Sequence, residues 1–259
     1  MIKILVAGYS GSMGQQGLKF IDEPPDFELV AGFALGATES DRQRFGLGEQ
    51  VKIYNELSQI EHGADVWIDF TAPSAVFENV KFALKHGMRP VVGTTGLTDE
   101  ELAELKQLAL AQQLGGLVAP NFGMSAVLLM KFAKEAAKYF PDVEIIEMHH
   151  DNKKDAPSGT ALMTAKLIAQ NRVPHHQGAK DETETLAHVR GGDYEGIKLH
   201  SVRLPGYVAH EQVLFGGAGE ALTIRQDSFD RASFMSGVKL AVQKAKALDG
   251  IIVGLENIL

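Results

Sequence analysis

The stretch from residue 147 to residue 160 concentrates side chains that could move protons and bind an anion. It reads EMHHDNKKDAPSGT, and His149 and Lys153 could each give or take a proton. Ser158, Gly159 and Thr160 offer hydroxyl and backbone N–H donors where a helix is expected to begin. So many titratable groups at the end of a strand are unusual for a structural turn. The segment therefore predicts a proton-transfer site that also binds a carboxylate or a similar anion.

Two other interpretations fit the same segment. His149, His150 and Asp151 could bind a metal ion, or the stretch could be an exposed turn with incidental histidines. Neighbouring residues of a strand point to opposite faces, and the HExxH spacing is absent, so we expect no metal ion. The residues alone leave the choice between a site and a turn open.

Three glycines lie at a second place where chemistry is expected. Gly8, Gly11 and Gly14 belong to the run GYSGSMG, between an apolar segment and an amphipathic one. Glycine lets a backbone turn tightly and approach a pyrophosphate, which the N-terminus of a helix favours. The spacing is GxxGxxG rather than GxGxxG, so the expected strand–loop–helix context carries the prediction of a dinucleotide site. A glycine-rich turn without a ligand is the alternative.

The residues after the second expected strand bear on the choice of cofactor. A dinucleotide fold usually has an acid about 20 residues after the glycine loop, where it binds the ribose hydroxyls. Residues 34–36 occupy this place without an acid; Glu39 and Asp41 are the nearest acids, beside Arg42 and Arg44. A missing carboxylate removes the repulsion of a 2′-phosphate, so the sequence favours NADPH over NADH. The two arginines could equally belong to a solvated loop.

Short apolar runs alternate with helical patterns through the first 120 residues. Thr98 and Glu101 form a candidate capping box before one of the helices. Strands that are apolar on both faces and alternate with helices indicate a parallel sheet covered on both sides. We therefore predict an α/β fold whose N-terminal domain is a Rossmann-like, doubly wound parallel sheet. Its strands are expected at residues 2–7, 27–34, 64–70, 90–92 and 117–119.

The pattern changes after Asn121. We expect helices at 126–140 and 158–170, and strands at 143–150, 197–204, 207–215 and 221–228. Short turns at Pro205 and Gly206 and at residues 216–219 predict that the last three strands form antiparallel hairpins. The C-terminal domain is thus expected to be α+β with a mixed or antiparallel sheet. A last helix is expected at 232–248, and this helix and the apolar tail at 251–259 are expected to pack against a large core.

Composition excludes several classes of protein. The chain has 259 residues, a net charge of −8 and no cysteine. Disulfides, cysteine-ligated zinc and thiol nucleophiles are therefore excluded, and the negative charge argues against a nucleic-acid partner. No apolar run reaches the roughly 18 residues of a membrane span. We expect a soluble cytoplasmic protein with no membrane partner.

Four motifs together resemble one enzyme family. GYSGSMG, the GTTG run at 93–96, APNF at 119–122 and EMHHDNKKDAPSGTA are similar to motifs of the dihydrodipicolinate (4-hydroxy-tetrahydrodipicolinate) reductases, and HSVRLPG at 200–206 extends the similarity. The resemblance implies reduction of a cyclic imine-type dicarboxylate by NADPH or NADH, with loss of water. The product, tetrahydrodipicolinate, would serve diaminopimelate and lysine synthesis.

The resemblance also implies roles for particular residues. His149 would be the general acid/base and Lys153 a proton donor. Substrate contacts would be His150, Ser158, Gly159, Thr160 and Thr95. The cofactor would be bound by Gly8, Ser10, Gly11, Ser12, Met13, Gly93, Thr94, Thr95, Ala119, Pro120, Asn121 and Phe122. Residues 1–122 and 231–259 would form the dinucleotide-binding domain, and residues 123–230 the domain that binds substrate and assembles a homotetramer.

Two places depart from the family pattern. Ser12 stands where many members have arginine, and residues 34–36 lack the acid that many members carry. Both places lie toward the adenosine ribose, so the departures concern the choice between NADH and NADPH and leave the hydride chemistry untouched.

Overall fold

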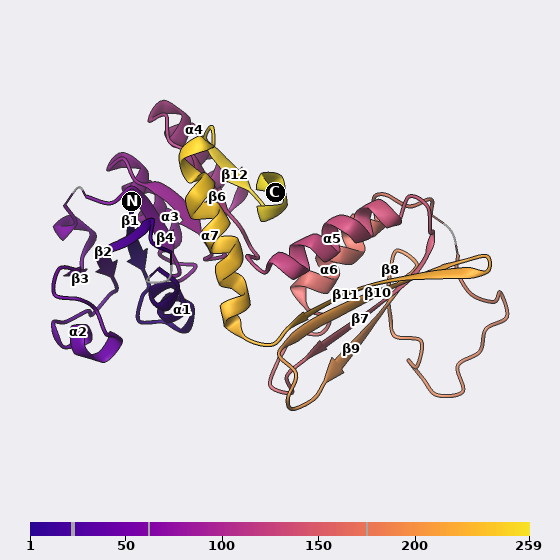
Figure 1. The fold of residues 1–259 in the computed structure, drawn as a ribbon. Coiled ribbons are helices and arrows are strands. Elements are labelled where there is room, and N and C mark those ends of the chain that lie inside the picture. Colours follow the sequence, from indigo (N-terminus) through magenta and orange to yellow (C-terminus); the bar gives the residue numbers. More distant parts are fainter. Residues whose placement is uncertain (22–23, 62, 175) are drawn as a thin grey trace. The chain divides into compact units, whose positions relative to one another are not determined.

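The computed structural model describes residues 1–21, 24–61, 63–174 and 176–259, which form two units (Figure 1). The first unit comprises Met1–Phe122 and Phe234–Leu259, and the second comprises Gly123–Ser233. The chain therefore leaves the first unit after Phe122 and returns to it at Phe234.

The first unit is built on a seven-stranded sheet in the order β12-β6-β5-β4-β1-β2-β3. All of its recorded pairings are parallel. The direction of strand succession reverses between β1 and β4, and such a switch point is where open α/β sheets bind ligands. This architecture confirms the predicted doubly wound domain. The strands are β1 (Ile2–Ala7), β2 (Phe27–Phe33), β3 (Lys52–Tyr54), β4 (Val66–Asp69), β5 (Arg89–Val92), β6 (Gly116–Val118) and β12 (Ile251–Val253).

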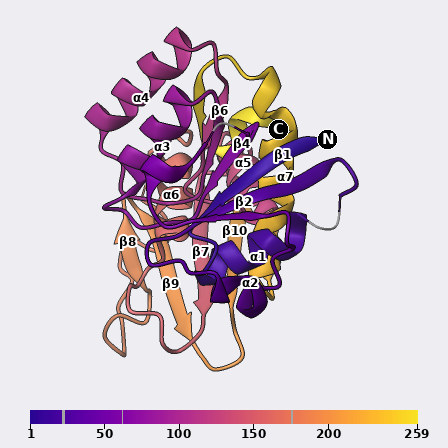
Figure 2. The same cartoon turned by 90° about the vertical axis from the view of Figure 1, so that its left-hand side faces the viewer.

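Helices cover both faces of this sheet. Leu5 packs in one core cluster with Ala83 of α3, whereas Val6 lies against Gly17 of α1. Consecutive strand residues point to opposite faces, so α1 and α3 lie on opposite sides of the sheet (Figure 2). α4 packs with α3, and α7 contacts α1. The helices are α1 (Ser12–Ile21), α2 (Ser40–Phe45), α3 (Val76–Lys85), α4 (Asp99–Ala111) and α7 (Met235–Lys244), with short 3₁₀ turns η1 (Leu57–Gln59), η3 (Ala245–Ala247) and η4 (Leu255–Ile258).

The capping box predicted at the start of α4 is confirmed. Thr98 Oγ1 accepts a hydrogen bond from the Glu101 backbone N–H at 3.2 Å, and the Thr98 N–H donates to Glu101 Oε2 at 2.9 Å. Two backbone donors that the helix leaves without a partner are thus satisfied reciprocally.

The second unit is a five-stranded mixed sheet in the order β11-β10-β7-β9-β8. Both α5 and α6 pack on one face of it, where Leu129 and Ala165 join Val143, Ile145 and strand residues from β9 and β10 in one core. The expected C-terminal α+β domain is therefore confirmed. Its elements are α5 (Met124–Ala136), β7 (Asp142–His149), α6 (Gly159–Ala169), β8 (Gly192–Tyr194), β9 (Ile197–Arg203), β10 (Ala209–Gly217) and β11 (Glu220–Ser228), followed by η2 (Arg231–Phe234).

One expected hairpin is wrong. β9 and β10 do not pair, because β7 lies between them, parallel to β9 and antiparallel to β10. The connection through residues 204–208 spans the end of β7, where the Leu204 N–H donates to the His149 carbonyl at 3.1 Å. Five residues are enough to cross the roughly 10 Å between strands on either side of a central strand. The hairpin expected between β10 and β11 does form.

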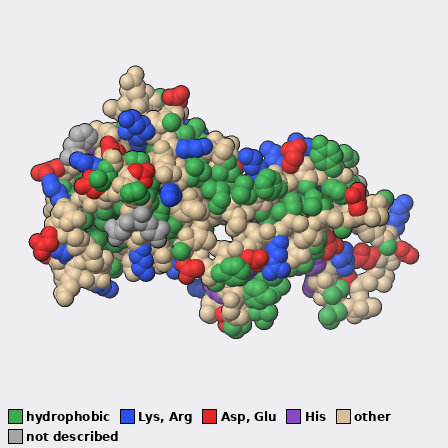
Figure 3. All heavy atoms as spheres, viewed as in Figure 1, with side chains coloured by type: hydrophobic (Ala, Val, Ile, Leu, Met, Phe, Trp, Pro, Cys, Tyr) green, Lys and Arg blue, Asp and Glu red, His purple; other side chains and the backbone are tan. Residues whose placement is uncertain are grey.

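Apolar side chains are also exposed on the second unit. Phe132 of α5 and Leu162 and Met163 of α6 have 53%, 40% and 46% of their surfaces exposed, and hydrophobic side chains are visible along α5 in Figure 3. In the described ranges, no helix is both long enough and apolar enough to cross a membrane.

Candidate active site

The glycine loop connects β1 to α1 at the switch point of the first sheet. Gly8 has φ of +79°, and a Cβ there would lie 2.3 Å from the Phe70 carbonyl oxygen. A Cβ on Gly14 would lie 2.1 Å from the Gly8 oxygen. Only glycine fits these two positions. The intervening Ser10 and Gly11 are exposed and lead into the first turn of α1, whose N–H groups have no intrahelical acceptor.

A cavity of about 560 Å³ borders this loop. Ala34 and Leu35 line it after β2, Asn55 and Glu56 after β3, and Thr71 after β4. A glycine cradle that a Cβ would fill, next to a cavity at a switch point, fits the phosphates and adenosine of a dinucleotide. The residues present are therefore compatible with NADPH or NADH.

The second predicted cofactor segment, Gly93, Thr94 and Thr95, follows β5 and is held in place by Asp69 at the end of β4. Asp69 is completely buried and accepts hydrogen bonds from Thr94 Oγ1 at 2.7 Å and from Thr71 Oγ1 at 2.6 Å. Sequence reasoning missed Asp69, although an acid that ends an apolar strand was an available signal.

The third predicted cofactor segment, formed by Ala119, Pro120, Asn121 and Phe122, follows β6. The Ala119 N–H donates to the Val92 carbonyl at 2.9 Å, which keeps this segment beside β5. All of the predicted cofactor residues therefore lie in loops at the carboxyl edge of the first sheet, except Ser12 and Met13, which open α1.

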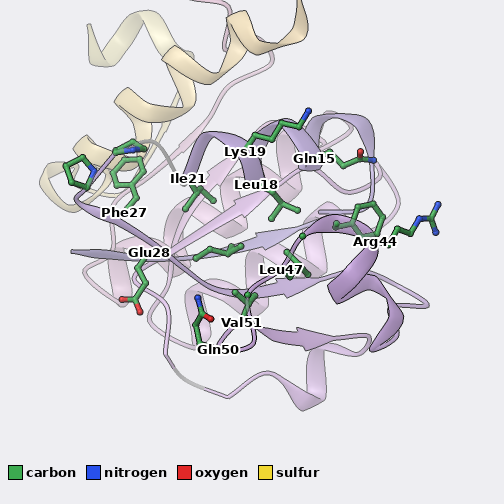
Figure 4. A pocket seen from close by; sticks show the side chains of 16 residues that line it. Gln15, Leu18, Lys19, Ile21, Phe27, Glu28, Arg44, Leu47, Gln50 and Val51 are labelled. Atoms are coloured by element: carbon green, nitrogen blue, oxygen red, sulfur yellow. The ribbon is translucent and has the colours of Figure 1, made fainter.

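The arginines considered for a 2′-phosphate lie elsewhere. The Arg42 guanidinium donates to the carbonyls of Gly48 and Val51 at 2.5 and 3.1 Å, so it closes its own loop. Arg44 lies over the Phe45 ring and borders a different cavity, of about 500 Å³, between α1, β2 and the segment after α2 (Figure 4). Neither arginine lines the cavity beside the glycine loop.

In the second unit, His149 ends β7 and is bound to a buried carboxylate. His149 Nδ1 lies 2.5 Å from Oε2 of Glu147, which is 0% exposed. The two Glu147 oxygens also accept from the Arg203 guanidinium at 2.8 and 2.7 Å. Burial acts to raise the pKa of Glu147, but hydrogen bonds from His149, Arg203 and Ser201 outweigh it and lower the pKa to about 2. An ionised carboxylate only accepts, so Nδ1 donates and Nε2 is left for another partner.

Glu147 also binds the start of α6. Its Oε1 accepts from the Ser158 N–H at 3.3 Å, while the Ser158 hydroxyl caps the helix by accepting from the Ala161 N–H at 3.2 Å. Gly159 and Thr160 form the first turn, whose N–H groups point away from the helix and have no intrahelical acceptor. The arrangement can therefore place an imidazole beside donors for a carboxylate.

Lys153 lies in the same connection but already has an anionic partner. Its ammonium group lies 2.7 and 2.9 Å from the two carboxylate oxygens of Asp155, and its backbone N–H donates to the His150 carbonyl at 3.2 Å. His150 itself is exposed. The structure thus brings His149, His150, Lys153 and the helix start into one connection of the second unit, whereas Thr95 belongs to the first unit.

Two residues of this site were missed by sequence reasoning. Glu147 and Arg203 both stood within recognised motifs, but their types alone did not show that they pair across 56 residues. The metal alternative gains no support, since no group of three histidines and acids in the described parts of the chain could hold an ion.

Two sequence profiles cover nearly the whole chain. "Dihydrodipicolinate reductase, N-terminus" matches residues 2–122, and "Dihydrodipicolinate reductase, C-terminus" matches residues 125–259. The chain belongs to the dihydrodipicolinate reductase family. A 4-hydroxy-tetrahydrodipicolinate reductase of Limosilactobacillus fermentum is 65% identical and covers 100% of both chains. Another, from Lactobacillus acidophilus, is 64% identical over 99% of this chain and 98% of the relative.

A solved member of the family agrees in fold along the whole chain. The dipicolinate-bound dihydrodipicolinate reductase from Paenisporosarcina sp. TG-14 is 46% identical, covers 100% of both chains and superimposes with a TM-score of 0.92. A scyllo-inositol dehydrogenase from Lactobacillus casei is 13% identical with a TM-score of 0.63, over 100% of this chain and 92% of its own. That likeness shows a shared fold alone.

Proposed function

We propose that this chain reduces 4-hydroxy-tetrahydrodipicolinate to tetrahydrodipicolinate with NADPH or NADH and loss of water, in diaminopimelate and lysine synthesis. Membership of the reductase family supports the reaction. The hydrogen bond between Glu147 and His149, next to the start of α6, is the observation that carries the mechanism.

His149 acts as the general acid/base, and Lys153 is the second candidate to give the proton. Because Nδ1 is bound to Glu147, Nε2 is the ring atom that faces a reaction partner. A positioned acid contributes roughly 100- to 10,000-fold to a rate. The bound reduced nicotinamide supplies the hydride; the protein supplies the proton and holds the reactants.

The first turn of α6 binds one carboxylate of the substrate. The N–H groups of Gly159 and Thr160 and the side chains of His150 and Ser158 provide donors, and Lys153 provides a positive charge once it exchanges Asp155 for the substrate. Thr95 of the first unit contributes a further polar contact. The dipicolinate bound by the Paenisporosarcina reductase is likewise a dicarboxylate.

For the cofactor, we propose that both NADPH and NADH are used and that NADPH is preferred. Residues 34–36 carry no acid to repel a 2′-phosphate. Glu56 borders the same cavity and opposes this preference, and Arg42 does not contribute because its guanidinium is bound within its own loop.

We propose a homotetramer assembled through the second unit, while the first unit binds the dinucleotide. Ile146, Val202 and Leu214 alternate with core residues, so they lie on the sheet face away from α5 and α6, where they are only partly buried. A partner's sheet would cover them. Sedimentation equilibrium should give a mass of four chains; a monomer would contradict this assembly.

Replacement of one histidine tests the proposed activity. Wild-type protein should oxidise NADPH when synthase-generated substrate is supplied, and His149→Gln should lower kcat by roughly 100-fold or more because the acid is lost. His176→Gln, an exposed histidine of the same unit, is the matched control and should behave as wild type. Wild-type turnover by His149→Gln would refute the assignment, and an inactive wild type would refute the function.

A second measurement tests the cofactor preference. Glu56→Gln should raise the ratio of kcat/KM for NADPH to that for NADH by about three- to tenfold, since one exposed like charge near a phosphate is worth about 1 kcal/mol. Glu39→Gln, which removes a carboxylate outside the cavity, should leave the ratio unchanged. An unchanged ratio in Glu56→Gln would show that this residue does not discriminate.

A further inference from the structure

Glu211 of β10 is a buried carboxyl group that the mechanism above does not use. It is 2% exposed and lies directly opposite Glu147 in the antiparallel register of β10 and β7. Both side chains face the helices, because Val213 and Ile145, two residues along each strand, belong to the core beneath α5 and α6. Within the described ranges, Glu211 Oε1 is buried without a hydrogen-bond partner. Two buried carboxyl groups so placed do not readily carry two charges.

Burial favours the neutral form of Glu211, whereas its hydrogen bond with Thr164 favours the ionised form. The Thr164 hydroxyl of α6 also donates to the Thr160 carbonyl at 3.0 Å. Because a hydroxyl has one hydrogen, the Thr160 carbonyl and the Glu211 carboxyl compete for it. Burial raises the pKa of Glu211 to about 7; hydrogen bonding to Thr164 opposes the rise and the charge of Glu147 adds to it.

The cationic and donor groups near Glu211 bind Glu147 instead. Glu147 pairs with the Arg203 guanidinium and is the hydrogen-bond partner of His149, so neither group is bound to Glu211. The polar groups at this end of the sheet are Glu147 and His149 of β7, Arg203 and Ser201 of β9, Thr164 of α6, Gln226 of β11 and Ser125 of α5, which donates to Gln226 at 3.1 Å.

We propose that Glu211 is a positioning residue of the substrate site. Its carboxyl group is protonated when a dicarboxylate binds, and loss of that proton weakens the binding. The inference rests on the proposed function. An ionised Glu211 would place a second negative charge beside Glu147, which holds the start of α6. It would also draw the Thr164 hydroxyl away from the Thr160 carbonyl, in the turn assigned to a substrate carboxylate.

The proposal couples ligand binding to proton uptake. If the ligand favours the protonated form, then by reciprocity its binding at alkaline pH transfers one proton from solvent to the Glu211 carboxylate. With a pKa of about 7, most Glu211 carboxyls are ionised at pH 8.5, so affinity there can fall by about tenfold or more.

Calorimetric titration of the protein with dipicolinate at pH 6 and pH 8.5 tests the coupling. The ratio of the two dissociation constants should be about tenfold or more larger in wild type than in Glu211→Gln, which imitates the neutral carboxyl. The comparison between variants removes the contribution of other titrating groups, His149 included. Glu220→Gln, an exposed glutamate of the same sheet, controls for loss of charge and should keep the wild-type ratio.

The outcomes separate the two proposals. An equal ratio in wild type and Glu211→Gln would overturn the role of Glu211 while leaving the reductase site intact. No binding by wild type at pH 6 would overturn the proposed substrate site, and this inference with it.

Infrared spectroscopy supplies a measurement that does not depend on a ligand. Wild type should show a protonated-carboxyl band at pH 6 that disappears by pH 8.5 and that Glu211→Gln lacks. If wild type and Glu211→Gln gave the same carboxyl signal at both pH values, the protonated assignment would be wrong.

Discussion

Glu147 joins three parts of the second unit with one carboxylate. It accepts from His149 on its own strand, from Arg203 on β9 and from the Ser158 backbone at the start of α6. Glu147 stays ionised at neutral pH, because its hydrogen bonds lower its pKa to about 2 although burial acts to raise it. The imidazole is therefore held in one tautomer and one orientation.

Glu147→Gln tests whether Glu147 fixes the tautomer of His149. The amide keeps the shape of the carboxylate but can present N–H to Nδ1, which permits the wrong tautomer of His149, so kcat should fall by roughly 100-fold. The KM for NADPH should stay near that of wild type. Steady-state kinetics with Glu144→Gln, on the same strand but the opposite face, provide the control; equal kcat values for the two variants would contradict the role.

Sequence patterns predicted part of this site. The motif around His149 and Ser158 is contiguous, so its residue types and the family resemblance were enough to indicate proton transfer beside an anion. Arg203 and Glu211 meet Glu147 only through the register of three strands. Register depends on how distant segments pair, and no local pattern records it.

At the scale of helices and strands, predictions were correct where the signal lies within a few neighbouring residues. The Thr98 capping box and the long helices follow from spacing within a few residues, and the structure has them. β3, β8 and β12 are each three residues long and were missed, whereas β6, which is equally short, was predicted as an apolar run directly after two glycines. The position of β7 between β9 and β10 was missed because strand neighbours are chosen by the whole sheet.

The packing of α1 against the glycine loop makes a prediction about two glycines. Gly14→Ala should destabilise the protein by about 1–3 kcal/mol, because its methyl group would lie 2.1 Å from the Gly8 carbonyl oxygen and the helix must shift. Gly11→Ala should cost less than about 1 kcal/mol, since its Cβ would meet that oxygen at 3.4 Å. Urea unfolding measures both; equal losses would show that the close approach of α1 is not needed.

At the scale of the whole molecule, the proposed roles divide between the two units. The loops proposed for the cofactor belong to the first unit, and the residues proposed for proton transfer belong to the second. The first unit is discontinuous in sequence, since α7 and β12 follow the second unit along the chain.

The first unit consists of two chain segments, and the end of one lies close to the start of the other. A Cβ on Gly237, three residues after the second segment begins, would lie 2.2 Å from the carbonyl oxygen of Phe122, the last residue of the first segment. Deleting residues 123–233 and joining Phe122 to Phe234 with a short flexible linker should give a folded protein that binds NADPH and has no reductase activity. The emission of Trp67, the only tryptophan and completely buried, should stay blue-shifted.

Truncation after Phe122 is the matched comparison, and it should aggregate. It lacks β12, so β6 becomes an unpaired edge, and it lacks α7, which buries Val238 and Ala241. Equal solubility of the two shortened proteins would contradict this. On the ribosome the same connectivity imposes an order of assembly: the first unit stays incomplete until the whole second unit has been translated.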